Sequence, residues 1–278
     1  MYPLFLLSLI FGIFPYKFES SNYVISKPRF IYCTIFAVFH SSYVLFSLYR
    51  VNSTSNYGNI PEILQGNFFE IFCGIICIVT YIFSRARLRV IQGLSEVSSR
   101  LPRSVFNNLA KWIHAKNLLG FTFLISHVFL IWKTNIIDGF NKLTALYLII
   151  LVFLMDMLYM DCVCVLKACF VRINENLINL KDILKTDEPH LLRRVYHEQR
   201  NPLLLIELQA IKQKHLQIST VLQTFNNTFS FQVIATVVLT FIEVTFSLYF
   251  YILHGSGPYD RQHCVLLCLL LKHLLGTL

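Results

Sequence analysis

The sequence predicts an all-α fold: a polytopic transmembrane helical bundle with an intracellular amino terminus and long cytoplasmic helical extensions. Three observations indicate this class. Hydrophobic residues make up 55% of the 278 residues and charged residues only 14%, whereas soluble domains carry about a quarter charged residues. Long apolar runs recur along the chain, and most basic residues fall between them. A water-soluble fold of this length could not bury so much apolar surface.

Five apolar runs approach the length that a membrane crossing needs, which is about 20 helical residues for a hydrocarbon core of about 30 Å. They are 30–49, 68–84, 118–132, 143–164 and 231–253. The third run is short, so we expect its helix to borrow residues from both flanks. A sixth run begins at Cys264 and reaches the last residue. The chain therefore divides into an amino-terminal segment, a five-span bundle, and an outer loop with an incomplete sixth span: 1–29, 30–253 and 254–278.

The amino-terminal segment opens with a mostly apolar stretch, 1–15, which has the composition of a signal peptide. It lacks a basic region at its start and a small-x-small cleavage site before Lys17, and secretory signals carry both. We therefore interpret 1–15 as an uncleaved helix at the membrane surface or on its cytoplasmic side.

The basic residues predict the orientation of the bundle. Three Lys and Arg lie in 1–29, seven in the 85–117 loop and nine in the 165–230 loop, whereas the opposite side holds four. Because basic residues favour the cytoplasmic side, we expect the amino terminus and both long loops in the cytoplasm of a multi-pass protein of the cell membrane. The sequon at 52–54 then lies outside, so Asn52 is a predicted glycosylation site. Basic blocks that alternate with apolar runs also argue against nucleic-acid binding, despite the formal charge of +9.

The eight cysteines lie mostly in or beside apolar runs, where a free thiol packs as a small hydrophobe. The Cys73-x3-Cys77 and Cys162-x-Cys164 pairs have no His or second cysteine pair at zinc spacing. We therefore predict no disulfide framework, no metal site and no cofactor. Catalytic signatures such as Gly-x-Ser-x-Gly, His-Glu-x-x-His or a phosphate loop are absent from the sequence, so we do not expect an enzyme.

Two acids are predicted to lie within the bilayer, Asp156 in the fourth span and Glu243 in the fifth. An ionisable side chain at this depth costs about 2.5–3.5 kcal/mol on insertion scales, so it needs a partner or a water-filled cavity. Two interpretations stay open. Either the acids share a proton or meet a cation, or each is neutral and hydrogen-bonded to a neighbouring helix.

Several polar and aromatic side chains fall at similar depth in the outer half of the spans. They are Glu70, His127, Tyr147, Tyr249 and Tyr251. Such a set fits a ligand pocket in a helical bundle, which is mostly apolar with a few polar groups. The alternative is an aromatic belt at the headgroup level, which explains the tyrosines without a ligand.

A heptad stripe follows Pro202 in the 165–230 loop. Its positions alternate steps of four and three residues: Leu204, Leu208, Ile211, His215, Ile218, Leu222, Phe225 and Phe229. A stripe of this period predicts a helix that packs against another helix and that continues into the fifth span. The partner is either a helix of the same chain or a second subunit. The predicted subunit contact comprises Ile211, His215, Ile218 and Leu222.

Two motifs resemble those of insect gustatory receptors. Residues 9–17, Leu-Ile-Phe-Gly-Ile-Phe-Pro-Tyr-Lys, are similar to the opening motif of that family. The second match begins with His215-x-x-Ile218, continues with Asn226 or Asn227, and ends with Phe-Ser-Phe-Gln-Val at 229–233. It looks like the family's signature at the entry to its fifth helix. With the inward amino terminus, the basic connections and the short outer loops, the resemblance covers essentially the whole chain.

The resemblance implies a seven-helix receptor of inverted topology that senses small tastants and assembles, with like or related subunits, as a tetrameric ligand-gated cation channel. It also implies a ligand pocket in the outer half of the bundle and subunit contacts on cytoplasmic extensions of the later helices. The family's last helix lines the pore and carries Thr-Tyr, a hydrophobic run and Gln. No such helix occurs before Leu278, so we expect this chain to lack the pore helix and not to conduct alone.

Two other classes of membrane protein fit the sequence less well. A G-protein-coupled receptor places its amino terminus outside, against the bias of the basic residues, and is expected to carry Asp-Arg-Tyr after its third helix, where none occurs. A transporter is expected to show an internal repeat or a pair of helices broken by Gly or Pro, and neither is found.

Overall fold

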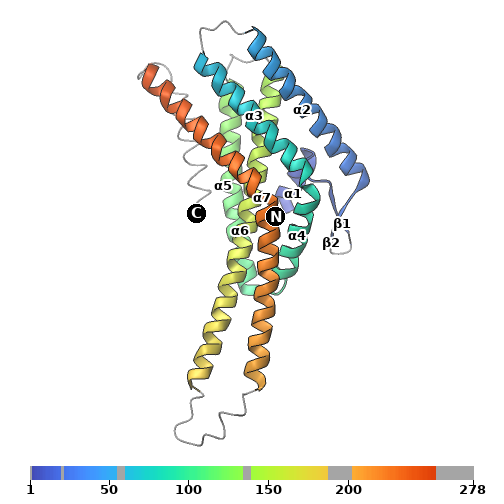
Figure 1. Ribbon diagram of the computed structural model, residues 1–278, viewed down its shortest axis with the longest axis vertical. Helices are drawn as coiled ribbons and strands as arrows, with labels where there is room; N and C mark the ends of the chain where they lie inside the picture. The colour runs from blue at the N-terminus through green and yellow to red at the C-terminus, as the bar shows by residue number, and fades with distance from the viewer. Residues whose placement is uncertain (1, 20–21, 55–59, 134–138, 187–201, 255–278) are drawn as a thin grey trace, which may run out of the picture.

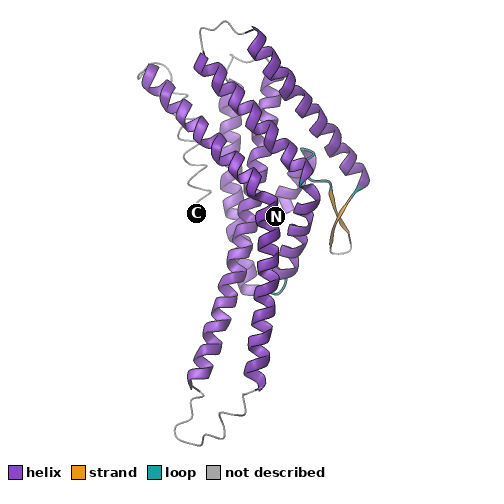
Figure 2. Ribbon diagram, viewed as in Figure 1, coloured by secondary structure: helices purple, strands orange, loops and turns teal. Residues whose placement is uncertain are grey.

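The computed structural model describes residues 2–19, 22–54, 60–133, 139–186 and 202–254, which form a bundle of α-helices with one short β-hairpin (Figures 1 and 2). The helices are α1 (Tyr2–Ile10), α2 (Lys27–Thr54), α3 (Ile60–Ile82), α4 (Ser84–Ser98), α5 (Arg103–Lys133), α6 (Gly139–Thr186) and α7 (Pro202–His254). The strands are β1 (Tyr16–Glu19) and β2 (Asn22–Ile25). The predicted all-α polytopic fold is confirmed.

Helix α6 forms the centre of the bundle. Helices α1, α3, α4, α5 and α7 all pack against it. Its central side chains are at most 2% exposed: Leu148, Leu151, Leu154, Met155 and Leu158. Apart from Asp156, this part of α6 is apolar on every face, and a helix of that kind is stable only when other elements or lipid surround it.

The surrounding helices turn apolar faces outward. Among the described residues, four helices are long and apolar enough to cross a membrane, over Lys27–Arg50, Ile63–Ile82, Leu143–Ile183 and Leu205–Phe250. Side chains such as Ile35, Val38 and Phe241 are more than 60% exposed, and contiguous apolar surface of this kind suits lipid rather than water. Helix α5 is not among the four. Its 31 residues nevertheless exceed the length that a crossing requires.

The predicted 85–117 loop is helical. Helix α3 ends at Ile82 and α4 begins at Ser84, so a single residue separates them. The turn at 99–102 then joins α4 to α5. The basic residues after 84 end the apolar run but do not end the helical hydrogen bonding, because Arg and Lys are good helix formers. This is the arrangement that the prediction of long helical extensions requires.

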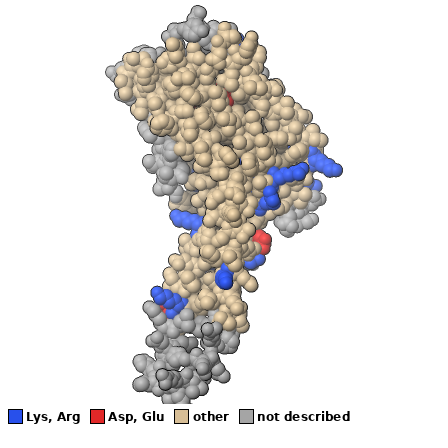
Figure 3. All heavy atoms as spheres, viewed as in Figure 1, with Lys and Arg blue, Asp and Glu red and all other residues tan. Residues whose placement is uncertain are grey.

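Helices α6 and α7 continue past the other helices and form a stalk, which we define as residues 171–183 and 205–216 (Figure 1). Most side chains of the stalk are exposed. The carboxyl end of α2 and the amino end of α3 lie at the opposite end of the molecule. On the face seen in Figure 3, Lys and Arg are exposed around the middle and on the stalk, whereas the described residues toward the opposite end are largely uncharged.

The amino-terminal segment packs into the bundle. Leu4 and Ser8 on α1 are fully buried, and α1 contacts α6. After α1, strands β1 and β2 pair antiparallel, with Tyr16 opposite Ile25. The sequence predicts a helix within 1–15 but no hairpin, because two four-residue strands are too short to give a period-two signal.

Candidate functional site

A hydrogen bond joins α3 to α7 at the end of the bundle away from the stalk. Gln65, near the start of α3, donates from Nε2 to Oε2 of Glu243 on α7 at 3.0 Å. Both side chains are half-buried in helices that are long and apolar enough to cross a membrane, where an acid needs a partner. Glu243, one of the two predicted intramembrane acids, therefore bonds to a neighbouring helix.

The residues predicted to contact ligand lie in different surroundings. Glu70 on α3 is half-buried and hydrogen-bonded to the side chain of Ser47 on α2. Tyr249 on α7 is 44% exposed, and its ring meets the ring of Phe250 edge-on. The side chains of two further members lie outside the described residues: His127 and Tyr251.

Tyr147 on α6 is the member of this set whose ring points into the bundle. The ring stacks on the imidazole of His40 on α2, with 3.7 Å between centroids and 6° between planes. Its hydroxyl donates to the backbone carbonyl of Phe11 at 3.2 Å. Tyr147 therefore joins α2, α6 and the turn that follows α1. His40, which is 4% exposed, was not predicted as a site residue.

A glycine makes this turn possible. Gly12 has a φ of +67°, and a Cβ at this position would lie 3.3 Å from Phe36 and from Tyr32 on α2. The Tyr32 hydroxyl donates to the carbonyl of Ile10 at 3.0 Å. Only glycine combines this backbone conformation with such close approach. Gly12 lies in the opening motif, residues 9–17, so that motif has a structural role in seating the amino-terminal segment against α2.

A fully buried arginine joins α4 to α7. Arg87 donates from Nη1 to the carbonyl of Thr80 at 2.7 Å and from Nη2 to Oε1 of Gln232 at 3.5 Å. Its guanidinium carbon lies 5.5 Å from the centroid of the Phe229 ring, within the range of a cation–π contact. Phe229 and Gln232 belong to the second motif of the resemblance. That motif is therefore the part of α7 that contacts the Arg87 side chain.

The Arg87 guanidinium stays charged although it is buried. Burial lowers the pKa of Arg87 to about 10, which is still far above neutral pH. The nearby phenol of Tyr16 donates to the carbonyl of Ser84, and burial raises the pKa of Tyr16, so it stays protonated. Among the described residues no carboxylate pairs with Arg87. Such a buried cation is costly, and costs of this kind concentrate at functional positions.

A buried ion pair joins α5 to α6. Lys116 Nζ lies 2.7 Å from Oδ1 of Asp161, and the two side chains are 6% and 0% exposed. Asn117 donates from Nδ2 to Oδ2 of Asp161 at 3.0 Å. Neither residue was predicted as part of a site: Lys116 lies among the basic residues of the predicted 85–117 loop, and Asp161 lies in the fourth apolar run. Helical spacing would have revealed the inward face, because Lys116 follows the buried Ile113 by three residues.

Helical spacing also reveals that Arg87 lies on a buried face. The buried positions of α4 include Arg87, Val90, Ile91, Leu94 and Val97. Val90, Ile91 and Leu94 follow Arg87 by three, four and seven residues, the spacing of one face of a helix. Arg87 therefore lies on the apolar stripe of α4, whereas Arg85 and Arg89 are exposed.

The part of the heptad stripe near the start of α7 is exposed, and the part nearer the fifth span packs against α6. Ile218 and Phe225 are at most 4% exposed, and Phe225 stacks on Tyr159 of α6 with 5.2 Å between ring centroids. His215 meets Phe170 of α6 edge-on at 6.0 Å. Leu222 is partly buried in the same core and Ile211 is half-buried, whereas Leu208 is 47% exposed. Packing within the chain therefore accounts for the stripe from Ile218 to Phe229. The exposed stalk remains available to a second subunit.

The remaining predicted positions are the second intramembrane acid, the glycosylation site and the cysteines. Asp156 is half-buried near the middle of α6. Asn52 is exposed near the end of α2, where its side chain bonds to the Leu48 carbonyl and to Asn67. In the part of the chain that the structure describes, six cysteines are free thiols and no three potential metal ligands come together.

A mostly apolar cavity of about 330 Å³ lies between α1, α4, α5 and α6. Leu94, Ile113 and Leu158 line it, with Ser95 and His114 as polar groups.

The chain matches a known protein family. The family described as the 7tm chemosensory receptors matches residues 1–276. No curated protein matches the chain.

Proposed function

The chain belongs to the 7tm chemosensory receptor family, and on that premise we propose that it is a gustatory receptor, a subunit of a ligand-gated cation channel that senses small tastants. The two motifs that resemble insect gustatory receptors support this assignment within the family. Gly12 and Gln232, one from each motif, both lie at contacts between segments.

The hydrogen bond between Gln65 and Glu243 is the observation that supports a ligand site best. It is a polar contact between two helices whose surroundings are apolar. A tastant with hydroxyl or amino groups offers the carboxylate the same kind of donor that the Gln65 amide offers. The tastant can therefore replace this bond, and the predicted contact residues form the rest of the proposed site: Glu70, His127, Tyr147, Tyr249 and Tyr251.

Helix α7 connects this site to the rest of the molecule. It is continuous from Pro202 to His254, so Glu243, Gln232 and the stalk belong to one element. A ligand that releases Glu243 from Gln65 biases the position of α7 relative to α3. A small shift of α7 then reaches the contact with Arg87 and the stalk, which is how a ligand selects between two arrangements of packed helices.

The stalk supplies the proposed contacts between subunits. Ile206 is 60% exposed, Leu208 47% and Leu216 55%. Apolar side chains at this exposure outside the membrane favour burial against a partner. We place Ile211 and His215 at the edge of that contact, in a homo- or hetero-tetramer with related receptors in the cell membrane. The other two predicted contact residues, Ile218 and Leu222, pack within the chain.

Cation currents in cells that lack other chemoreceptors test the proposal. The chain is expressed alone and with related receptors, and sugars, bitter compounds and amino acids are applied in turn. For a compound that evokes current, Glu243→Gln should raise the half-maximal concentration, because it weakens the group that binds the tastant. Gln65→Leu should lower the half-maximal concentration or raise the basal current, because it removes the bond that the tastant replaces. The matched control is Glu96→Gln, which removes an exposed carboxylate on α4. Unchanged dose–response curves in both site variants, with normal surface expression, would exclude this ligand site.

A further inference from the structure

A second cavity lies where the stalk meets the bundle. It has a volume of about 160 Å³ and is open on one side. Three basic residues from three parts of the chain line it: Arg100 after α4, Arg172 on α6 and Lys214 on α7. Asn176 and Gln217 add side-chain amides, and the lining contains no acidic residue.

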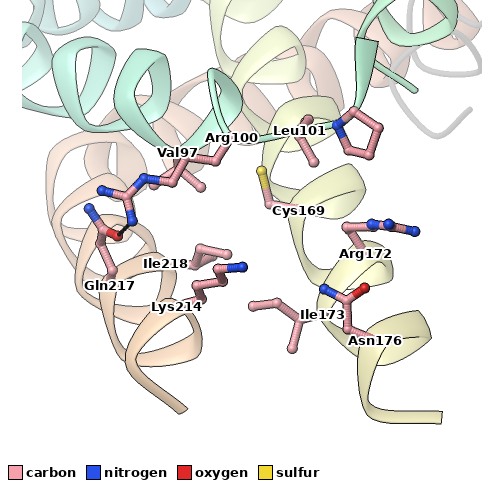
Figure 4. A pocket seen from close by; sticks show the side chains of 11 residues that line it. Val97, Arg100, Leu101, Cys169, Arg172, Ile173, Asn176, Lys214, Gln217 and Ile218 are labelled. Atoms are coloured by element: carbon pink, nitrogen blue, oxygen red, sulfur yellow. Dashed lines mark hydrogen bonds between the residues drawn. The ribbon is translucent and has the colours of Figure 1, made fainter. Parts of the chain in front are cut away.

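The ion pairs around this cavity leave one ammonium group available. Arg100 is held by Glu96 at 3.0 Å and by Gln217 at 2.9 Å. Arg172 is paired through Nη1 with Glu175 at 3.0 Å, which leaves its other nitrogens available. In the described part of the chain, Lys214 has no ion pair. Figure 4 shows Lys214 and Asn176 extending into the space between α6 and α7.

The cavity is basic at its rim and apolar within. Cys169, Ile173 and Ile218 cover part of its wall, together with Val97 and Leu101. Its α6 residues follow the apolar run 143–164 and its α7 residues precede the run 231–253, so it lies just beyond the hydrocarbon-spanning part of the bundle. Under the predicted topology this level is the cytoplasmic surface of the membrane, where anionic headgroups are found.

We propose that this cavity binds an inositol phosphate group, either as the headgroup of a membrane lipid or as a free inositol phosphate. The Lys214 ammonium and the available nitrogens of Arg172 supply charged donors to phosphate oxygens. The Asn176 amide supplies a neutral donor, and the apolar wall accommodates the ring or the start of a lipid. Occupancy would link α6 to α7 at the base of the stalk. This inference does not depend on which tastant the outer site binds.

Binding to the purified full chain tests the proposal. The 278-residue chain is reconstituted in phosphatidylcholine nanodiscs and titrated with short-chain phosphatidylinositol 4,5-bisphosphate and, separately, with free inositol 1,4,5-trisphosphate. Saturable binding of either probe, with phosphatidylcholine alone inactive, supports the site. A lipid that binds more tightly than the free headgroup identifies a membrane source, and equal affinities identify the phosphate group as sufficient.

Three variants locate the binding. Lys214→Gln should weaken it by about fivefold or more, the effect expected for one basic contact with an anionic headgroup. Lys214→Arg should retain it. Lys212→Gln is the matched control, because it removes the same charge two residues away at an exposed position that does not line the cavity.

Two outcomes overturn the proposal. The first is absence of saturable binding for both probes. The second is an equal loss in Lys212→Gln and Lys214→Gln, which would indicate a nonspecific effect of total charge. Both conclusions require that the variants elute as the same monodisperse species as the unmodified chain.

Discussion

Asp161 on α6 and Lys116 on α5 form an ion pair of 2.7 Å that is almost completely buried. A second ion pair of similar length, Arg172 with Glu175, lies on the surface with side chains 39% and 51% exposed. The two pairs differ mainly in their environment. Burial therefore decides how much the loss of one partner costs.

Asp161→Asn should destabilise the protein by about 3–5 kcal/mol, because Lys116 is left as a buried charge without a counter-charge. Glu175→Gln should cost at most about 1 kcal/mol, since its pair is exposed and screened. Heating in detergent, followed by measurement of the remaining monodisperse protein, gives the ranking. Replacing both partners, with Lys116→Met and Asp161→Leu, should recover part of the loss, because it removes both buried charges but takes the acceptor from the Asn117 amide. A double variant as unstable as Asp161→Asn would contradict this reasoning.

Tyr147→Phe should cost about 1 kcal/mol, because it removes only the hydrogen bond to the carbonyl of Phe11 and leaves the stacking on His40 in place. Tyr49→Phe is the control, since Tyr49 is 73% exposed on α2. The same heat-stability assay compares the two. If both substitutions had equal effects, the hydroxyl of Tyr147 would not be a structural contact.

Gly12→Ala should destabilise the protein by about 1–2 kcal/mol, because a side chain disfavours the positive φ. Contact of the new methyl group with Phe36 and Tyr32 adds to that cost. Gly66→Ala on α3 is the opposite case, because no atom lies within 4 Å of its Cβ position. That substitution should stabilise the helix by about 0.5–1 kcal/mol. Unfolding midpoints that move in the same direction for both variants would argue against the described turn.

Arg87→Lys should reduce stability by about 1.5–3 kcal/mol, the value of a hydrogen bond from a charged donor. Lysine keeps the charge, but its compact ammonium cannot reach both the Thr80 carbonyl and the Gln232 amide as the planar guanidinium does. Arg89→Lys, at an exposed position on the same helix, should change stability by less than about 0.5 kcal/mol. Equal midpoints for the two variants would show that Arg87 does not bridge α4 and α7.

The sequence was sufficient for the large elements of the fold. The apolar runs at 30–49, 143–164 and 231–253 lie within helices long and apolar enough to cross a membrane, and the run 68–84 overruns such a helix, α3, by two residues. Hydropathy records where apolar side chains stop, however, and helical hydrogen bonding continues beyond that point. The apolar runs therefore do not locate the helices within 85–117.

The contacts between distant segments were harder to predict. Glu243 was recognised as an acid that needs a partner, but nothing in the local sequence identifies Gln65, 178 residues away, as the donor. His40 was missed because a single histidine in an apolar run has no pattern of its own. Arg87 was not predicted because a count of basic residues does not distinguish it from the exposed Arg85 and Arg89. Only its helical spacing places it on the apolar face of α4.

Glycosylation mapping in cells measures the orientation of the bundle. We expect a glycan at Asn52, lost in Asn52→Gln, and at an acceptor sequon inserted in 134–138, but none at a sequon inserted in 187–201 between the two halves of the stalk. Asn226, in the native sequon at 226–228, should also stay unmodified. A glycan within 187–201 together with an unmodified 134–138 would place the stalk outside the cell and would show that the predicted orientation is wrong.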